Sequence, residues 1–209
     1  MMLKAVAWDI DGTLVDSEPL HHRALLAGSA SFDVDLSDLP EEEFLGVHMA
    51  DVWRILRPRM PEGLAEQAWL DTIIRHYVAH RHEARPMPGA VEAVRALSAA
   101  GIPQACVSNS SRPIVDANLD ALGIAGLMAF SLSFDDVPRG KPDPSPYAEA
   151  CRRLGLAPRE VLAVEDSATG IASARAAGLA CAALGFDPGA GVRRIAGPAD
   201  VRAMLMGGR

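Results

Sequence analysis

Short apolar segments that alternate with helical patterns are the feature that most constrains the fold of this 209-residue chain. These segments have the length and the small or branched residues of buried strands, and they cover Ala5–Ile10, Pro103–Ser108, Met128–Phe134, Val161–Val164 and Leu179–Leu184. Strands that are separated by helices pair in parallel, because each helix returns the chain to the same end of the sheet. The pattern predicts an α/β fold with a doubly wound, parallel, Rossmann-like sheet.

A long insertion separates the first two apolar segments, and one crossover helix does not need that length. The insertion lacks strand-like alternation and has helical stretches at Pro19–Ala30, Pro40–Leu45, Ala50–Leu56 and Leu64–His82. The last stretch carries an apolar stripe of period 3.6 that predicts a separate hydrophobic core. We therefore expect a discontinuous α/β core at residues 1–16 and 87–209, an all-helical domain at residues 17–86, and hinge strands at Asp16-Ser17 and Arg85-Pro86.

Charge and apolar content narrow the class of protein. The formal net charge is -7, whereas a nucleic-acid-binding protein is expected to carry a basic face. No run of eighteen apolar residues is present, and the segment before Asp9 is too short for a signal peptide. We expect a cytoplasmic enzyme with a small-molecule substrate and no nucleic-acid or membrane partner. No long exposed apolar surface is evident, so a monomer or a weak dimer is expected.

The cysteines argue against a redox or structural metal protein. Cys106, Cys151 and Cys181 are widely spaced, odd in number and without a CxxC pair. A disulfide framework or a zinc site needs paired ligands at short spacing. We expect free, buried thiols.

Two carboxylates follow the first apolar segment, in the motif Asp9-Ile10-Asp11-Gly12-Thr13. Residues two apart in a strand point the same way, so the side chains of Asp9 and Asp11 begin on one face. Two like charges this close favour a divalent cation, and Mg²⁺ prefers a few carboxylate oxygens and leaves room for a substrate phosphate. The pentapeptide by itself also fits an Asx-type turn that ends the strand.

Three further polar motifs lie where later strands are expected to end: Ser108-Asn109, Lys141 and Glu165-Asp166. Ser108 alone would be read as a helix N-cap. Lys141 is one of two lysines in the chain and lies in a turn-rich segment that would hold its ammonium group in place. Glu165 and Asp166 add two carboxylates at a strand end. Ligands bind at the carboxyl ends of strands in open α/β sheets, so we expect these side chains to meet.

In this order the motifs resemble those of the haloacid dehalogenase (HAD) superfamily, in its phosphatase and β-phosphoglucomutase-like branch. The segments that carry the resemblance are Asp9–Glu18, Ser108-Asn109, Gly140–Asp143 and Glu165–Gly170, and they span nearly the whole chain. The helical insertion is similar to the superfamily's small cap domain. The resemblance implies a Mg²⁺-dependent phosphomonoester hydrolase that acts on a small phosphorylated metabolite, with sugar phosphates as the expected class.

The resemblance also implies a role for each motif. Asp9 would attack phosphorus and form an aspartyl phosphate, and Asp11 would act as general acid and then as general base. Lys141 would bridge Asp9 and a phosphoryl oxygen. The expected metal ligands are Asp9, the backbone carbonyl of Asp11, Asp166 and Glu165, the last directly or through water. The expected phosphate ligands are Ser108, Lys141 and backbone amides near Gly12 and Asn109.

Single positions weigh against other activities of the superfamily. Dehalogenating members have no use for Asp11 or for a full cation site. Phosphonoacetaldehyde hydrolases need a cap lysine, and no lysine lies between Lys4 and Lys141. A sugar-phosphate mutase remains the alternative, because His21 lies where such a mutase has a histidine. However, the basic residues around a cap glycine loop are missing at Leu45–Met49.

The cap residues are expected to determine the substrate. Positions close to the hinge or to the glycine loop should face the substrate, and the candidates are His21, His48 and Met49. His21 and His22 are adjacent on an expected helix, so one should face the active site and the other solvent. A non-catalytic protein that binds a phosphorylated ligand is the alternative of another class, although no expected nucleophile or cation ligand is missing.

Overall fold

The computed structural model describes residues 2–44 and 47–206, and the chain divides into two compact units. The first unit comprises Met1–Asp16 and Arg85–Arg209, and the second comprises Ser17–Ala84. The first unit is a parallel α/β core, which confirms the predicted fold class. No helix in the described part of the chain is both long and apolar enough to cross a membrane.

The core unit contains a six-stranded parallel sheet with strand order β5-β4-β1-β6-β7-β8. Its strands are β1 (Ala5–Trp8), β4 (Gln104–Val107), β5 (Phe130–Leu132), β6 (Val161–Glu165), β7 (Ala180–Leu184) and β8 (Arg193–Ile195). Five of them lie where apolar segments predicted them, although most are shorter. The sixth, β8, was not predicted, because two of its three residues are exposed arginines and the strand lies at the sheet edge.

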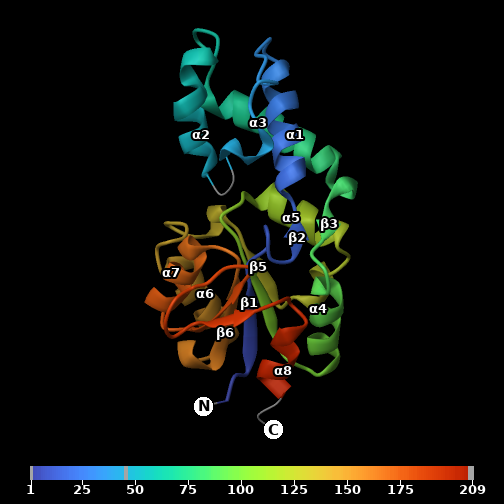
Figure 1. The fold of residues 1–209 in the computed structure, drawn as a ribbon, viewed down its shortest axis with the longest axis vertical. Helices are drawn as coiled ribbons and strands as arrows, with labels where there is room; N and C mark the ends of the chain where they lie inside the picture. The colour runs from blue at the N-terminus through green and yellow to red at the C-terminus, as the bar shows by residue number, and fades with distance from the viewer. Residues whose placement is uncertain (1, 45–46, 207–209) are drawn as a thin grey trace. The chain divides into compact units, whose positions relative to one another are not determined.

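Side chains of β1 alternate between two packed faces, as expected for a central strand. Ala5 and Ala7 belong to the hydrophobic cluster that includes residues of α6 (Ser145–Leu154) and α7 (Ala168–Ala176). On the other face, Trp8 donates from Nε1 to Oε1 of the buried Gln104 at 2.9 Å. Figure 1 shows α6 and α7 together on one side of the sheet, and α4 (Ala90–Ala99) with α8 (Asp200–Met206) on the other.

The remaining elements of the core unit connect these layers. They are β2 (Val15–Asp16), β3 (Arg85–Pro86), α5 (Arg112–Ala121), η4 (Ala125–Leu127), η5 (Phe134–Asp136) and η6 (Pro158–Glu160), where η marks a 3₁₀ helix. Strands β2 and β3 pair antiparallel, with Val15 opposite Pro86 and Asp16 opposite Arg85. The first hinge strand therefore lies one residue earlier than predicted, because Ser17 is already the N-cap of a helix.

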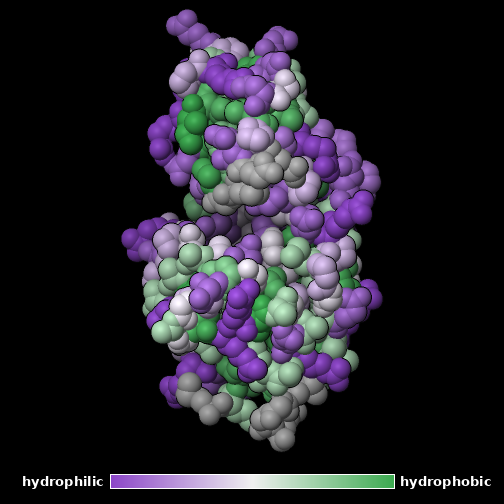
Figure 2. All heavy atoms as spheres, in the orientation of Figure 1, coloured by the Kyte–Doolittle hydropathy of each residue, from purple (hydrophilic) through white to green (hydrophobic). Residues whose placement is uncertain are grey.

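The second unit is helical, with α1 (Glu18–Ala30), η1 (Glu41–Phe44), α2 (Met49–Leu56), η2 (Arg57–Arg59), α3 (Glu66–Ala79) and η3 (Arg81–Glu83). Helix α1 packs closely on α3, since a Cβ on Gly28 would lie 2.5 Å from the side chain of Ile73. Trp69 and Tyr77 of α3 are fully buried, which confirms the predicted apolar stripe. Figure 2 shows hydrophobic side chains along α2, where Ile55 is 55% exposed.

Two predicted helices of this unit differ from the structure. Pro40–Leu45 contains only the 3₁₀ helix η1, and Leu45 lies outside the described residues. The predicted helix Leu64–His82 is shorter at both ends and becomes α3. Its start is delayed because Ala65 is extended, and its end changes to the 3₁₀ helix η3.

Candidate active site

The carboxyl ends of β1 and β6 lie side by side at the centre of the sheet and place three carboxylates together. Trp8 is in register with Val164, and the Asp9 amide donates to the Val164 carbonyl at 2.9 Å. Asp9 and Glu165 are buried, and Asp166 follows directly. In the sheet order, the chain runs from β1 through β4 to β5 and then returns to β6. The carboxylates therefore lie at a topological switch point, where open α/β sheets bind ligands.

Gly12 makes room for Asp166. The chain turns sharply after Asp11, and Gly12 has a φ of 77°, in the left-handed region that glycine tolerates. A Cβ at this position would lie only 2.0 Å from Oδ2 of Asp166. The Gly12 amide donates to the Val15 carbonyl at 2.8 Å. The glycine therefore admits the Asp166 carboxylate, and the expected role of backbone amides near Gly12 as phosphate ligands stays a prediction.

Lys141 joins two of the carboxylates. Its Nζ lies 2.6 Å from Oδ1 of Asp9 and 2.6 Å from Oε1 of Glu165. The buried Tyr147 donates its hydroxyl to Glu165, and its ring centroid lies 5.4 Å from Nζ of Lys141. Asn109 exchanges two hydrogen bonds with the Lys141 backbone, one donated by its Nδ2 at 3.0 Å and one accepted by its Oδ1 at 2.8 Å. The Lys141 ammonium is thus held at both its backbone and its charged end.

Asp11 turns its carboxylate toward a different set of groups. Ser110 donates from Oγ to Asp11 Oδ2 at 2.8 Å, and Ser108 donates to the same oxygen at 3.2 Å. Asn118 donates from Nδ2 to Asp11 Oδ1 at 3.1 Å. The carboxylate of Asp11 therefore lies beside Ser108, as the motifs predicted, and its backbone follows Asp9 at the strand end.

Two polar residues of this site, Asn118 and Tyr147, were not predicted from the sequence, whereas Ser110 was expected only as a further donor beside Ser108. Asn118 and Tyr147 each occupy a position on the buried face of a helix, where a polar group needs a partner. Asn118 is fully buried between apolar neighbours such as Val115 and Leu119, and that pattern is visible in the sequence. A polar residue inside an apolar stripe was the signal that could have identified it.

Burial raises the proton affinity of the acidic cluster. Burial, with a further contribution from Glu165 and Asp11 and against the opposing charge of Lys141, raises the pKa of Asp9 to about 7. Burial and the Asp9 charge raise the pKa of Asp166 to about 7. Burial lowers the pKa of Lys141, but the charges of Asp9 and Glu165 outweigh it and the pKa is raised. Near neutral pH, a divalent cation that binds these carboxylates would therefore compete with protons.

The acidic cluster has the composition of a site for a hard divalent cation. Asp9, Glu165 and Asp166 offer carboxylate oxygens that all lie within 4.8 Å of one another. Oδ2 of Asp9 is buried and has no hydrogen-bond partner among the described residues. An unpartnered buried carboxylate oxygen is costly unless it is ligated. These three residues therefore fit a metal ion, whereas the carboxylate of Asp11 is bound by serine and asparagine donors.

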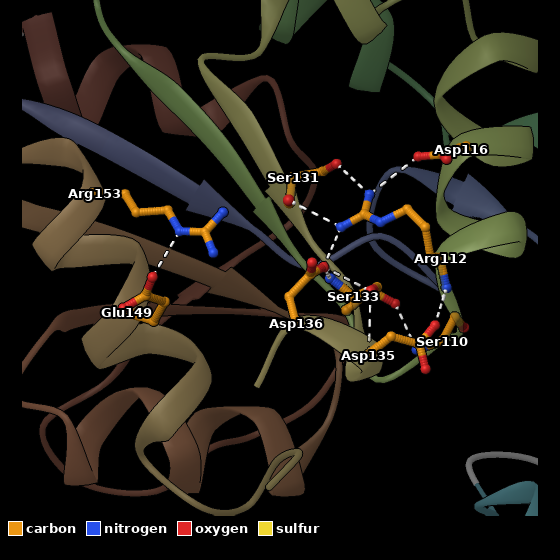
Figure 3. A network of polar contacts seen from close by, with 10 residues as sticks. Ser110, Arg112, Asp116, Ser131, Ser133, Asp135, Asp136, Glu149 and Arg153 are labelled. Carbon is orange, nitrogen blue, oxygen red and sulfur yellow. Dashed lines mark hydrogen bonds and ion pairs between the residues drawn. The ribbon is translucent and has the colours of Figure 1, made fainter. Parts of the chain in front are cut away.

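Arg112 is the first residue of α5 and connects that helix to residues at and after the end of β5. Figure 3 shows its guanidinium between Asp116, Ser131 and Asp136. Ser133 donates its amide and its hydroxyl to Asp136 at 2.7 and 2.6 Å. These hydrogen bonds and the Arg112 charge outweigh burial and lower the pKa of Asp136 to about 2. The network ties the start of α5 to the end of β5.

The candidate cap residues lie within the helical unit. The ring centroid of His21 lies 4.5 Å from that of Tyr77, and Nε2 of His22 is buried, while both histidines are partly exposed as whole residues. Which of the two faces the active site stays a prediction. His48 is the N-cap of α2, where its Nδ1 accepts from the Ala50 amide at 3.3 Å, and Met49 begins that helix. Leu45-Gly46 lies outside the described residues. The substrate-facing role of His21, His48 and Met49 stays a prediction.

The cysteines are free and buried, as expected. Together, the core site offers a buried carboxylate held by an ammonium, an acidic cluster that fits a cation, and a hydroxyl-rich loop. This arrangement suits transfer of a phosphoryl group, because positive charge can gather where phosphoryl oxygens would lie.

Comparisons with known proteins agree with this geometry. Residues 3–178 match the haloacid dehalogenase-like hydrolase family. The phosphoglycolate phosphatase of Thiobacillus denitrificans is 31% identical, over 90% of this chain and 86% of the relative. Hexitol phosphatase A of Escherichia coli is 34% identical, over 85% of this chain and 81% of the relative. The crystal structure of CbbY from Rhodobacter sphaeroides in complex with phosphate has a TM-score of 0.88 at 28% sequence identity. The match covers 98% of this chain and 99% of the CbbY chain. The chain therefore belongs to the haloacid dehalogenase-like hydrolase family, and it is a phosphatase of that family.

Proposed function

We propose that this phosphatase is a Mg²⁺-dependent phosphomonoesterase that hydrolyses small phosphorylated metabolites, with sugar phosphates as the principal class, through a covalent intermediate on Asp9. The observation that carries the proposal is the environment of Asp9. One of its oxygens contacts Nζ of Lys141 at 2.6 Å, and the other is buried without a hydrogen-bond partner among the described residues. A nucleophile that must approach a dianion needs this kind of fixed positive charge.

Asp9 and Asp11 divide the chemistry. An Asp9 oxygen attacks phosphorus, an Asp9–phosphorus bond forms, and the bond from phosphorus to the ester oxygen breaks. The departing oxygen takes a proton from Asp11, which is thereby ionised. Asp11 then removes a proton from water, and the water oxygen attacks phosphorus and releases inorganic phosphate from Asp9. Each step leaves Asp11 in the protonation state that the next step requires.

Other residues of the core hold the phosphoryl group. Lys141 neutralises charge on a phosphoryl oxygen while it stays in contact with Asp9. Ser108 donates its hydroxyl to a second oxygen, with the backbone amide of Asn109 beside it. Mg²⁺ would be held by Asp9, Asp166 and the backbone carbonyl of Asp11, with Glu165 as a direct or water-mediated ligand, and when bound it supplies charge neutralisation at the phosphoryl oxygens.

The substrate class rests on the relatives. Two of them are named for phosphoglycolate, the small phosphate ester of a hydroxy acid, and for hexitols, which are polyols. A CbbY variant of Rhodobacter sphaeroides, with 28% identity and a TM-score of 0.87, was crystallised with xylulose-(1,5)bisphosphate. We propose that the Ser17–Ala84 unit serves as the cap that selects among such esters, with His21, His48 and Met49 as candidate contacts.

The test is release of inorganic phosphate from a panel of sugar, polyol and carboxylic-acid phosphates, with Mg²⁺ and again with a chelator. We expect chelator-sensitive release, and no release by Asp9→Asn. Release that persists in the chelator would overturn the metal dependence, and release by Asp9→Asn would overturn the nucleophile. Transfer of phosphate between sugar positions without release would identify a mutase instead.

A further inference from the structure

We infer that Asn118 and Ser110 are positioning residues for Asp11, and that they aim its carboxylate at the leaving-group oxygen of the substrate. The inference rests on the proposed function, in which Asp11 protonates that oxygen. It concerns two residues that belong to none of the four motifs. Both residues donate hydrogen bonds to the Asp11 carboxylate, and the proposed role is exerted through Asp11.

The two donors fix the plane of the Asp11 carboxylate. Asn118 Nδ2 lies 3.1 Å from Oδ1, and Ser110 Oγ lies 2.8 Å from Oδ2. A carboxylate that is held by one donor can still rotate about its terminal torsion, which is broad. Two donors on different oxygens remove that rotation. Because proton transfer needs heavy atoms within about 2.6–3.2 Å, the orientation of Asp11 determines its efficiency.

Ser108 cannot replace these donors when substrate is bound. Its hydroxyl donates to Asp11 Oδ2 at 3.2 Å and accepts from the Ser110 amide at 2.9 Å. A serine hydroxyl has one proton, so it can donate either to Asp11 or to a phosphoryl oxygen. Once Ser108 binds the phosphoryl group, Ser110 and Asn118 keep the Asp11 carboxylate in place.

Both donors are themselves anchored. Asn118 is fully buried, and it lies on the apolar face of α5, where the side chain has little freedom to turn away. The carbonyl of Ser110 accepts from the Phe134 amide at 2.9 Å. Two residues further on, the Arg112 amide donates to Asp135 at 2.7 Å, as Figure 3 shows. Burial of the Asn118 amide costs free energy of folding unless the amide forms hydrogen bonds, so its bond to Asp11 is important for the fold as well.

Substrates with different leaving groups can distinguish a loss of Asp11 positioning from a general loss of structure at the active site. An alkyl alcohol is a poor leaving group and needs the Asp11 proton, whereas p-nitrophenolate leaves without one. The ratio kcat/KM covers only the steps through cleavage of the ester, so hydrolysis of the aspartyl phosphate does not enter it. A misaimed Asp11 should therefore lower kcat/KM for an alkyl ester and spare the nitrophenyl ester.

The experiment compares glycerol phosphate with p-nitrophenyl phosphate in the full-length protein with Mg²⁺. Asn118→Leu keeps the branching and the number of heavy atoms of the side chain and removes the donor. We expect this variant to lower kcat/KM for glycerol phosphate about tenfold and to change kcat/KM for p-nitrophenyl phosphate less than about twofold. The tenfold loss is part of the total general-acid contribution of Asp11, which is typically about 10²–10⁴-fold. Ser110→Ala should show the same selectivity. Asp11→Asn should show it with a larger amplitude.

Leu119→Ala is the matched control, because Leu119 is the buried neighbour of Asn118 on α5. Any loss in this variant should be equal for the two esters. An equal loss on both esters in Asn118→Leu and Ser110→Ala would overturn the inference and assign them a structural role. If Asn118→Leu fails to fold, the selectivity of Ser110→Ala decides. Failure of the wild type to hydrolyse either ester, or an equal loss in Asp11→Asn, would overturn the proposed function itself.

Discussion

The α-carbon of Gly140 faces the side chain of Asn109 so closely that a Cβ would lie 2.6 Å from Asn109 Oδ1. The same Cβ would lie 2.8 and 2.9 Å from two ring atoms of Phe134. Asn109 Oδ1 accepts the Lys141 amide at 2.8 Å, so this contact bears directly on the placement of Lys141. The segment before Lys141 can approach Asn109 only because residue 140 has no side chain.

Gly140→Ala is therefore expected to displace Lys141. The new methyl group must push Asn109 or Phe134 aside, which costs about 1–3 kcal/mol of the free energy of unfolding. We also expect kcat/KM for the best phosphate ester to fall about tenfold or more, because a small misplacement at a reacting centre has large effects. Urea unfolding and phosphate-release kinetics measure the two effects.

Gly126→Ala is the control for this substitution. A Cβ on Gly126 would meet no atom within 4 Å, so the change should alter stability by less than about 0.5 kcal/mol and leave activity unchanged. Equal effects of the two substitutions would show that the contact between Gly140 and Asn109 does not place Lys141.

Asp9→Asn should abolish turnover while the fold is kept. The amide has nearly the volume of the carboxylate, but it is a poor nucleophile and a weaker cation ligand. We expect phosphate release to fall to the uncatalysed background, with an unchanged far-ultraviolet circular dichroism spectrum. Turnover near that of the wild type would contradict the mechanism.

The stabilising effect of Mg²⁺ should depend on pH. The pKa values of Asp9 and Asp166 are raised to about 7, above the value of about 3.9 in an unfolded chain. The folded, metal-free protein thus holds protons that the unfolded chain releases. The stability that these groups contribute is present at low pH and is lost as pH rises from about 4 through about 7.

Mg²⁺ binds the ionised carboxylates, so it should raise Tm more at about pH 8 than at about pH 5.5. At a concentration near a hundred times Kd, the gain is about 2.7 kcal/mol, or roughly 5–10 °C for a chain of this size. Thermal melts with Mg²⁺ or with chelator at both pH values measure it. Asp166→Asn should reduce the gain. A gain of the same size at both pH values would contradict the assignment of the raised pKa values to the metal site.

Asp136→Asn should destabilise the core unit. Asp136 accepts the amide and the hydroxyl of Ser133 and pairs with Arg112, and the amide side chain replaces one acceptor oxygen with a donor. We expect a loss of about 1–3 kcal/mol at neutral pH. Because its pKa is lowered to about 2, the contribution of Asp136 is lost as pH falls toward that value.

Asp116→Asn is the comparison, since Asp116 is also a partner of Arg112 but its side chain is 62% exposed. Exposed pairs contribute little, so the loss should stay below about 0.5 kcal/mol. Chemical denaturation of both variants between about pH 3 and pH 7 gives the comparison. Equal losses in the two variants would show that the Ser133 hydrogen bonds add nothing.

Most of the sheet could be predicted because its strands are buried on both faces and are therefore continuous apolar segments. Strand β8 escaped prediction, since an edge strand with Arg193 and Arg194 has no such segment. The helical character of the insertion could be predicted from the stripe that includes Trp69 and Tyr77. The 3₁₀ helix η1 could not be predicted, because four residues are too few to show a hydrophobic period that would distinguish a 3₁₀ helix from an α-helix.

The sequence alone determined which chemical groups the site contains, because Asp9, Lys141 and Glu165 lie in short motifs that can be read along the chain. Asp9 and Glu165 lie at the ends of β1 and β6, whereas Lys141 lies between η5 and α6. Only the tertiary structure decided how these groups are partnered. Asn118 lies 107 residues from Asp11, and its donation to that carboxylate depends on where α5 packs. The same holds for Gly140 against Asn109. A local motif specifies a side chain and its strand, but contacts between distant segments depend on how all the elements pack, which no short stretch of sequence encodes.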